Sequence, residues 1–197
     1  MYFTKMFMEE SGSLSYLVGC VDEGTACVIN PKRDVLDYLE TAGIAGMKIT
    51  HIFDTRKPED SYLNGNMEMM LRTGAKIYYL NKDAFQINGT VAAEGDAFNF
   101  GNARLEIIES PCHDLFSGTI RVSDTANPDE PWVILGRDSL FVGNLVDEDT
   151  SSKAVAEELS CYLDTHEEYG KSPSMMESMC QSMPGLERDN PVYASTF

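Results

Sequence analysis

The chain has 197 residues, of which 43% are hydrophobic, and this is enough apolar surface for one well-packed core. Fifteen Lys and Arg against 32 Asp and Glu give a formal net charge of −17, so the molecular field repels nucleic-acid phosphates and anionic lipid surfaces. There is no run of about 18 apolar residues, and residues 1–12 lack the apolar core of a signal peptide. The composition therefore predicts one domain over residues 1–197, located in the cytoplasm, with no nucleic acid and no membrane as partner.

The cysteines indicate a reducing compartment. They form an odd set without C-x-x-C spacing, which argues against a disulfide framework and against a structural zinc site. The five residues are Cys20, Cys27, Cys112, Cys161 and Cys180.

The first part of the chain alternates strand and helix patterns. Short apolar runs predict a β-hairpin of residues 13–18 and 26–29, followed by an amphipathic helix over 33–42 that is capped near Asp34. A buried strand is predicted over 48–53, then a polar loop, a helix over 66–73 that stops at Gly74, and a strand over 75–80. This is the order of a βαβ unit.

The remainder of the chain is first rich in strands and then helical. The predicted strands are 90–93, 97–100, 103–108, 117–122 and 132–135, with a turn-rich segment over 123–131. A helix is predicted over 152–163 and a methionine-rich helix over 174–183. An α/β layered fold with two sheets packed inside helices fits this order best.

Several short motifs resemble those of one family, in the family's order and over nearly the whole chain. They are Y-L-V-G at 16–19, A-C-V-I-N-P at 26–31, K-I-T-H-I-F-D-T at 48–55, R-T-G-A-K-I-Y at 72–78, S-P-C-H at 110–113 and D-S-L-F-V-G at 138–143. The chain resembles the metallo-β-lactamase superfamily, within it the branch of persulfide dioxygenases and glyoxalase II. The resemblance implies an αββα sandwich, in which two mixed β-sheets are flanked by helices.

The metal motif of that family is degenerate in this sequence. The family carries H-x-H-x-D-H directly after the position of Thr55, but residues 56–61 read R-K-P-E-D-S. Guanidinium has no available lone pair, proline has no donor side chain and serine is a weak metal ligand. Of this motif only Asp60 remains, and the first ligand histidine of the family falls on Arg56.

The resemblance places three further candidate metal ligands, at His113, Asp138 and His166. Together with Asp60 they make four candidates, whereas a dinuclear hydrolase needs more histidines than the three in this chain. We therefore expect no dinuclear site.

Two interpretations of the remaining residues stay open. In the first, the permanent cation of Arg56 substitutes for a metal between Asp60 and Asp138, so no cofactor binds. In the second, Asp60, His113, Asp138 and His166 hold one iron or zinc ion. The two histidines can also be remnants of an ancestral site. The remaining histidine of the chain, His51, lies in a predicted buried strand and is expected to be a hydrogen-bonded core residue.

Cys112 stands directly before His113, where the family has glycine, so its thiol can face the same site. Beside an imidazole such a thiol can act as a nucleophile or carry a persulfide sulfur, and the alternative is an inert, packed side chain.

Two functional hypotheses follow. The first is a scaffold without the family's metal-dependent catalysis, which retains a relic pocket near Arg56 for a small thiol, a glutathione-like ligand or a partner protein. The second is a mononuclear metal-dependent persulfide dioxygenase or thioester hydrolase that uses His113, Asp138 and His166, with Asp60 as fourth ligand or base. The first hypothesis keeps a link to sulfur metabolism, and the resemblance also suggests a homodimer.

Overall fold

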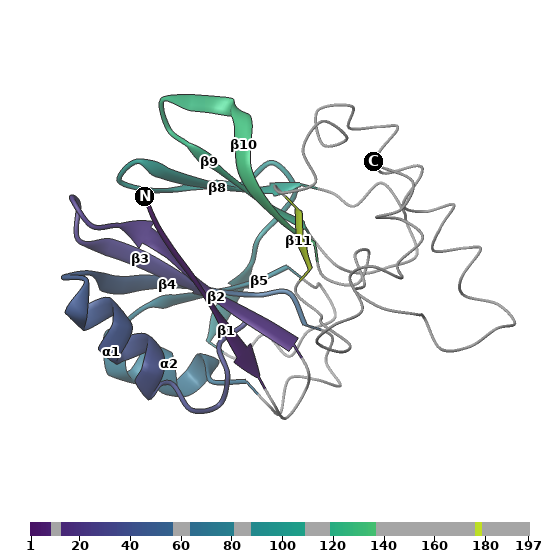
Figure 1. Ribbon diagram of the computed structural model, residues 1–197. Coiled ribbons are helices and arrows are strands. Elements are labelled where there is room, and N and C mark those ends of the chain that lie inside the picture. The colour runs from purple at the N-terminus through teal and green to yellow at the C-terminus, as the bar shows by residue number, and fades with distance from the viewer. Residues whose placement is uncertain (9–12, 57–63, 81–87, 109–118, 137–175, 179–197) are drawn as a thin grey trace, which may run out of the picture.

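The computed structural model describes residues 1–8, 13–56, 64–80, 88–108, 119–136 and 176–178. In these ranges the chain forms two stacked β-sheets, with two helices on the outer face of the first sheet (Figure 1). This is the two-sheet α/β architecture that the sequence predicted. No helix within these ranges is long and apolar enough to cross a membrane.

The first sheet is mixed and has the strand order β1-β2-β3-β4-β5-β6. Strands β1, β2 and β3 pair antiparallel, whereas β3, β4, β5 and β6 pair parallel. The parallel strands therefore end at the same edge of the sheet. The bounds are β1 Tyr2–Met8, β2 Ser13–Cys20, β3 Thr25–Ile29, β4 Lys48–Asp54, β5 Lys76–Tyr79 and β6 Gly89–Val91.

Two short helices, α1 (Leu36–Ile44) and α2 (Asn66–Thr73), supply the parallel crossovers and cover the outer face of this sheet (Figure 1). Tyr38 and Met69, which are fully buried, pack from the helices into an apolar cluster with the sheet. Gly74 ends α2 in the left-handed conformation, with φ 73° and its N–H bonded to the Met70 carbonyl at 2.8 Å. The helix over 66–73 and its glycine stop were predicted from the sequence and are confirmed.

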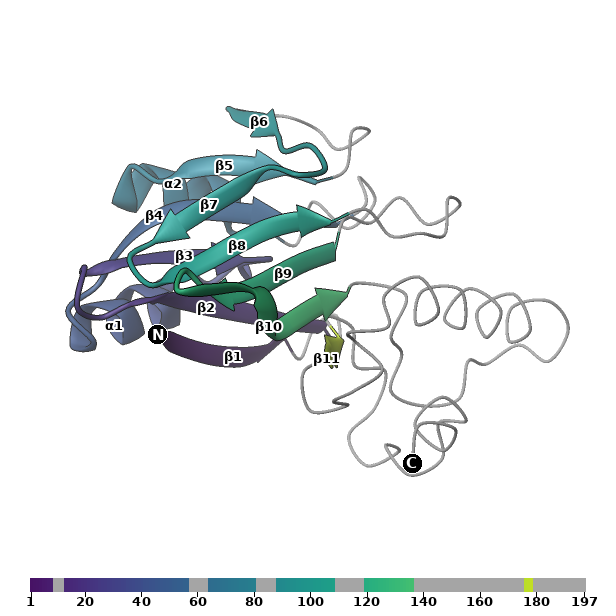
Figure 2. The same cartoon turned by 90° about the horizontal axis from the view of Figure 1, so that it is seen from above.

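The second sheet lies across the first and has the order β11-β10-β9-β8-β7 (Figure 2). In β8 the side chains alternate between buried and half-buried, and Ala103, Leu105 and Ile107 face the first sheet. Together with Phe53 and Phe100 they belong to the core between the sheets. The bounds are β7 Ala97–Phe100, β8 Ala103–Ile108, β9 Thr119–Asp124, β10 Asn127–Gly136 and β11 Met176–Ser178.

Several elements differ from the sequence prediction. The strand β1 was not predicted, although it pairs with β2 along its whole length. The helix α1 begins at Leu36 rather than at residue 33. Its cap residue is Val35, which makes no side-chain cap hydrogen bond. Asp34 instead accepts a hydrogen bond from the Leu36 N–H at 3.1 Å, so the carboxylate supports the turn that precedes the helix.

The turn predicted over 123–131 is wrong. Strands β9 and β10 run through most of it and leave only residues 125–126 between them. The register shifts at Pro131 and again before Val133, and such irregularities accommodate a proline that cannot donate to the ladder.

The methionine-rich helix predicted over 174–183 is wrong at Met176–Ser178, which pair parallel with β10 as strand β11. Backbone pairing to a sheet edge overrides a helical spacing of methionines there. The other residues of that segment, and the helix predicted over 152–163, lie outside the described residues.

Candidate functional site

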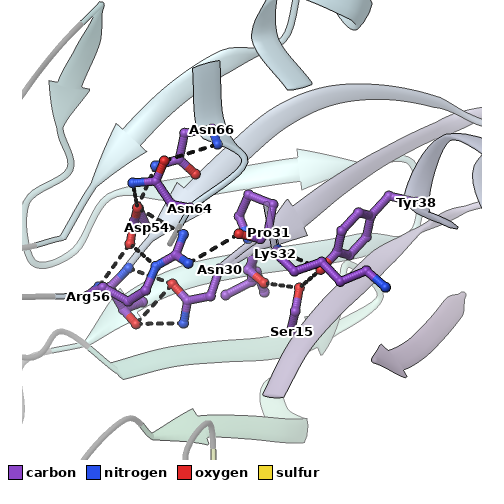
Figure 3. Close-up of polar contacts among 11 residues, drawn as sticks. Ser15, Asn30, Pro31, Lys32, Tyr38, Asp54, Arg56, Asn64 and Asn66 are labelled. Atoms are coloured by element: carbon purple, nitrogen blue, oxygen red, sulfur yellow. Dashed lines mark hydrogen bonds and ion pairs between the residues drawn. The ribbon is translucent and has the colours of Figure 1, made fainter. Parts of the chain in front are cut away.

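Polar side chains collect where β3, β4 and β5 end together. This edge is formed by the C-terminal ends of parallel strands, which is where open α/β sheets bind ligands. The residues come from the turn after β3, the end of β4 and the start of α2 (Figure 3). Apart from Arg56, none of them was singled out as a candidate from the sequence.

Asp54 and Arg56 form a buried, bidentate ion pair at the end of β4. The Arg56 Nε donates to Oδ1 of Asp54 at 2.9 Å and its Nη2 donates to Oδ2 at 3.1 Å. The backbone N–H of Arg56 also donates to Oδ1, at 3.0 Å. Only 2% of Asp54 and 8% of Arg56 are exposed. A planar guanidinium matches a carboxylate in this fork geometry, so the pair fixes the direction in which the chain leaves β4.

The same carboxylate also holds the start of α2 (Figure 3). The amide nitrogen of Asn66 donates to Oδ2 of Asp54, and that of Asn64 donates to the same oxygen at 3.4 Å. A carboxylate offers about four acceptor positions, and here five donor groups approach it. Asp54 therefore has no lone pair left with which to bind a metal ion.

Arg56 and the start of α2 are tied to the turn after β3 as well. The Nη1 of Arg56 donates to the carbonyl oxygen of Pro31 at 3.1 Å, and the Gly65 N–H donates to the same oxygen at 3.1 Å. Beside them, Asn30 accepts a hydrogen bond from the Thr55 N–H at 2.8 Å while its own backbone is left-handed, with φ 52°. Asparagine tolerates that conformation better than most residues.

A second buried chain of hydrogen bonds attaches α1 to the sheet next to this cluster (Figure 3). The Tyr38 hydroxyl donates to Ser15 Oγ at 2.7 Å and accepts from the Lys32 N–H at 2.9 Å. Ser15 Oγ in turn donates to the Ile29 carbonyl at 2.9 Å. Burial raises the pKa of Tyr38, so the phenol stays protonated and its hydroxyl acts as a structural link.

The described residues at this edge offer no ligands to a metal ion. The guanidinium of Arg56, which the resemblance places at the start of the family's metal motif, is a cation without a free lone pair. Its partner carboxylate is saturated with hydrogen bonds, as described above. Within the described ranges, no group of three or more His, Cys, Asp or Glu side chains is placed to hold a metal. The other candidates, Asp60, Cys112, His113, Asp138 and His166, lie outside the described residues.

The described partner of Arg56 was not named from the sequence. One interpretation of the sequence had Arg56 between Asp60 and Asp138, which lie outside the described residues; within the described residues its partner is Asp54. The available signal was an acidic residue two positions before the arginine, at the end of a buried strand.

His51, Cys20 and Cys27, which were also considered from the sequence, lie away from this edge in packed or hydrogen-bonded positions. His51 is half-buried, and its Nδ1 lies 2.9 Å from Thr50 Oγ1, so the predicted hydrogen-bonded histidine is confirmed. Cys20 and Cys27 are buried free thiols. Burial raises the pKa of the Cys27 thiol above its usual range, so Cys27 stays protonated.

Known proteins similar in sequence are hydroxyacylglutathione hydrolases. The chain is 35% identical to that of Rhodospirillum rubrum over 107 residues, which is 53% of this chain and 41% of the relative. It is 30% identical to that of Rhizobium johnstonii over 110 residues, 55% of this chain and 42% of the relative. The match thus spans about two fifths of the length of these curated relatives. No family model matches the chain.

Solved structures with the same fold cover nearly the whole chain. ETHE1 from Myxococcus xanthus aligns with a TM-score of 0.69 at 19% identity, over 94% of this chain and 77% of that protein. A metallo-β-lactamase from Staphylococcus aureus aligns with a TM-score of 0.68 at 21% identity, over 92% of this chain and 56% of that protein. The fold that the sequence motifs implied is therefore confirmed: the chain has the metallo-β-lactamase fold, and about half of it is similar in sequence to hydroxyacylglutathione hydrolases.

Proposed function

We propose that this chain is a metallo-β-lactamase-fold protein that lacks the metal-dependent catalysis of its relatives. The observation that carries the proposal is the buried pair of Arg56 and Asp54, at the position where the family's metal motif begins. A guanidinium there repels a metal cation, and it is bonded to a carboxylate and to a backbone carbonyl.

The pair is also costly to displace. Removing one partner of a buried ion pair costs about 3–5 kcal/mol, because the other charge is left uncompensated in the interior. A metal that needed Arg56 to move away would have to overcome this cost. The residues 56–61 provide no histidine that could offset it.

The position of the Asp54–Arg56 pair suggests where a ligand other than a metal would bind. The edge formed by β3, β4 and β5 remains a ligand-binding position of the fold even without a metal. We propose a small thiol, such as a glutathione-like ligand, or a partner protein at this relic pocket, with Arg56, Asp60, His113 and Asp138 lining it. The chain is similar in sequence to hydroxyacylglutathione hydrolases, whose named substrate is a glutathione derivative. This similarity supports a glutathione-like thiol as the ligand.

The same similarity favours one alternative. A mononuclear persulfide dioxygenase or thioester hydrolase would use His113, Asp138 and His166 as ligands of one iron or zinc ion, with Asp60 as fourth ligand or base. None of these residues is Arg56, so the alternative needs no displacement of the ion pair.

Metal content decides between the two. We expect purified protein, expressed with iron and zinc available, to contain less than about a tenth of a metal ion per chain. We also expect no hydrolysis of a hydroxyacylglutathione thioester and no oxygen consumption with glutathione persulfide. Near-stoichiometric metal that is lost in His113→Ala would contradict the proposal and establish the alternative. Binding of reduced glutathione, measured by calorimetry on the metal-free protein, tests the ligand separately.

A further inference from the structure

We infer that His51 is an acid-sensitive contact between the two sheets, and that its protonation weakens the packing of β7 against β4 and β5. The inference concerns the core between the sheets rather than the edge that carries Arg56. It is independent of the proposed function, because it holds whether or not the chain binds a metal or a thiol.

The imidazole of His51 sits among four aromatic rings that come from both sheets. It is stacked with Phe53 on its own strand, at 6.4 Å between ring centroids and 9° between planes, and with Tyr78 on β5, at 5.6 Å and 16°. Two rings of β7 meet it edge to face: Phe98 at 6.0 Å and 63°, and Phe100 at 4.9 Å and 83°. His51 therefore takes part directly in the contact between the first and the second sheet.

The hydrogen bonds of Thr50 determine which nitrogen of His51 receives an added proton. Thr50 Oγ1 donates to the Ala26 carbonyl at 3.2 Å and lies 2.9 Å from His51 Nδ1. A hydroxyl has one proton, and the carbonyl can only accept, so Nδ1 must be the donor toward Thr50. The neutral ring then has its free lone pair on Nε2, and acidification places a proton there.

Within the described ranges, the groups that act on the charge of His51 include no carboxylate. On β5 its register partner is Lys76, a cation, and on β3 it is Cys27, whose buried thiol stays protonated. The side chains that face it from β4, β5 and β7 are the four aromatic rings described above. Burial, and after it the positive charge of Lys76, lower the pKa of His51.

Because the pKa of His51 is lowered in the folded state, acidification destabilises the fold. A histidine with a lowered pKa in the folded state stabilises the fold fully above its unfolded pKa of about 6.5, and this stability is lost as the pH falls below that value. The faces of Phe53 and Tyr78 attract a cation and oppose the effect. We expect the loss of hydration and the positive charge of Lys76 to disfavour protonation of His51 more than the aromatic faces favour it.

Urea unfolding of the full chain and of His51→Phe, from pH 8 to pH 5, tests the inference. Below pH 6.5 we expect the unfolding equilibrium constant of the wild type to rise relative to the variant, by up to about tenfold per pH unit for one proton. The chain has three histidines, and the other two are present in both proteins, so their contributions cancel. Parallel pH dependences of the two proteins would overturn the inference.

Two further measurements do not depend on the folding of that variant. In the wild type, an NMR titration of the His51 ring should give a pKa below 6.5, and Lys76→Gln should raise it. The amide hydrogen-exchange protection factors of Phe98 and Phe100 should fall between pH 8 and pH 5 more than those in β2, because the contact with β7 is the one that weakens. A His51 pKa above 6.5, or no response to Lys76→Gln, counts against the inference.

Discussion

At the scale of single residues, one carboxylate organises the candidate site. Asp54 receives hydrogen bonds from Arg56, Asn64 and Asn66, which come from both sides of residues 57–63. The pair with Arg56 is buried, and within the described residues its two charges are compensated by each other, by these hydrogen bonds and by the Pro31 carbonyl. In the interior an ion pair contributes little net stability, but an uncompensated charge is strongly unfavourable.

Arg56→Met should therefore destabilise the fold by about 3–5 kcal/mol, because it leaves the Asp54 carboxylate buried and unpaired. The matched control is Arg72→Met, which removes the half-exposed i,i+4 pair of Arg72 with Glu68 and should cost about 0.3–0.5 kcal/mol. Urea unfolding at pH 7 measures both. Equal losses in the two variants would mean that Asp54 and Arg56 are not the buried pair described here.

The raised pKa of Tyr38 predicts an alkaline limit of stability. In the unfolded chain a tyrosine ionises near pH 10, whereas the folded chain keeps Tyr38 protonated to higher pH. The stability due to this residue is complete below about pH 10 and is lost as the pH rises from there through the folded pKa. Tyr38→Phe should lose less stability between pH 9 and pH 11 than the wild type, as measured by urea unfolding.

At neutral pH the same variant should be less stable by about 1 kcal/mol, since Ser15 and the Lys32 N–H lose their hydrogen-bond partner. Tyr79, whose pKa burial also raises, is present in both proteins and does not affect the comparison. A steeper alkaline loss in Tyr38→Phe would contradict the assignment.

At the scale of elements, the predictions that succeeded depended on strong local signals. The segment from β4 through α2 to β5 has a run of apolar residues, then a helical pattern that Gly74 stops, and its elements lie where they were predicted. The extension of β9 and β10 through most of residues 123–131 was missed because the prolines and polar residues there are typical of a turn. Pairing of β9 with β8 and with β10 makes these residues strands.

Two glycines of the helices should respond to alanine with opposite signs. Gly74→Ala places a side chain on a left-handed residue, with φ 73°, and should destabilise the fold by about 1 kcal/mol. Gly43→Ala lies inside α1, where an added Cβ meets nothing within 4 Å, and should stabilise it by about 0.5–1 kcal/mol. Thermal unfolding of the two variants checks both signs, and a gain for Gly74→Ala would show that the helix ends differently.

At the scale of the whole molecule, the net charge of −17 is the dominant feature. Such an excess of one sign destabilises the compact state through self-repulsion. The Debye length falls from about 30 Å at 0.01 M salt to about 8 Å at 0.15 M, so added salt should screen this repulsion. We expect the Tm to rise by several degrees over this range of NaCl concentration.

The control for this prediction is KCl, which should give the same Tm at equal ionic strength if the effect is screening rather than specific ion binding. A Tm that falls with added salt would mean that favourable ion pairs, such as Arg121 with Glu106, outweigh the net repulsion.

The sequence by itself determined the fold class and the absence of histidine from residues 56–61. Apolar periodicity and glycine stops are local properties, and the motifs stand in the order of the family, so these conclusions needed no coordinates. That Arg56 cannot act as a metal ligand follows from the chemistry of its side chain alone.

Only the tertiary structure decided what Arg56 binds instead. Asp54 is only two residues from Arg56, but the Pro31 carbonyl that also accepts from Arg56, and the Asn64 and Asn66 amides that share the Asp54 carboxylate, come from separate segments. The pairing of β3 with β4 and the crossover through α2 bring them together. In the same way, the rings around His51 come from β4, β5 and β7 and meet only when the two sheets stack. A hydrogen bond or a ring contact depends on distances of a few ångströms between residues far apart in the chain, and local sequence patterns do not encode those distances.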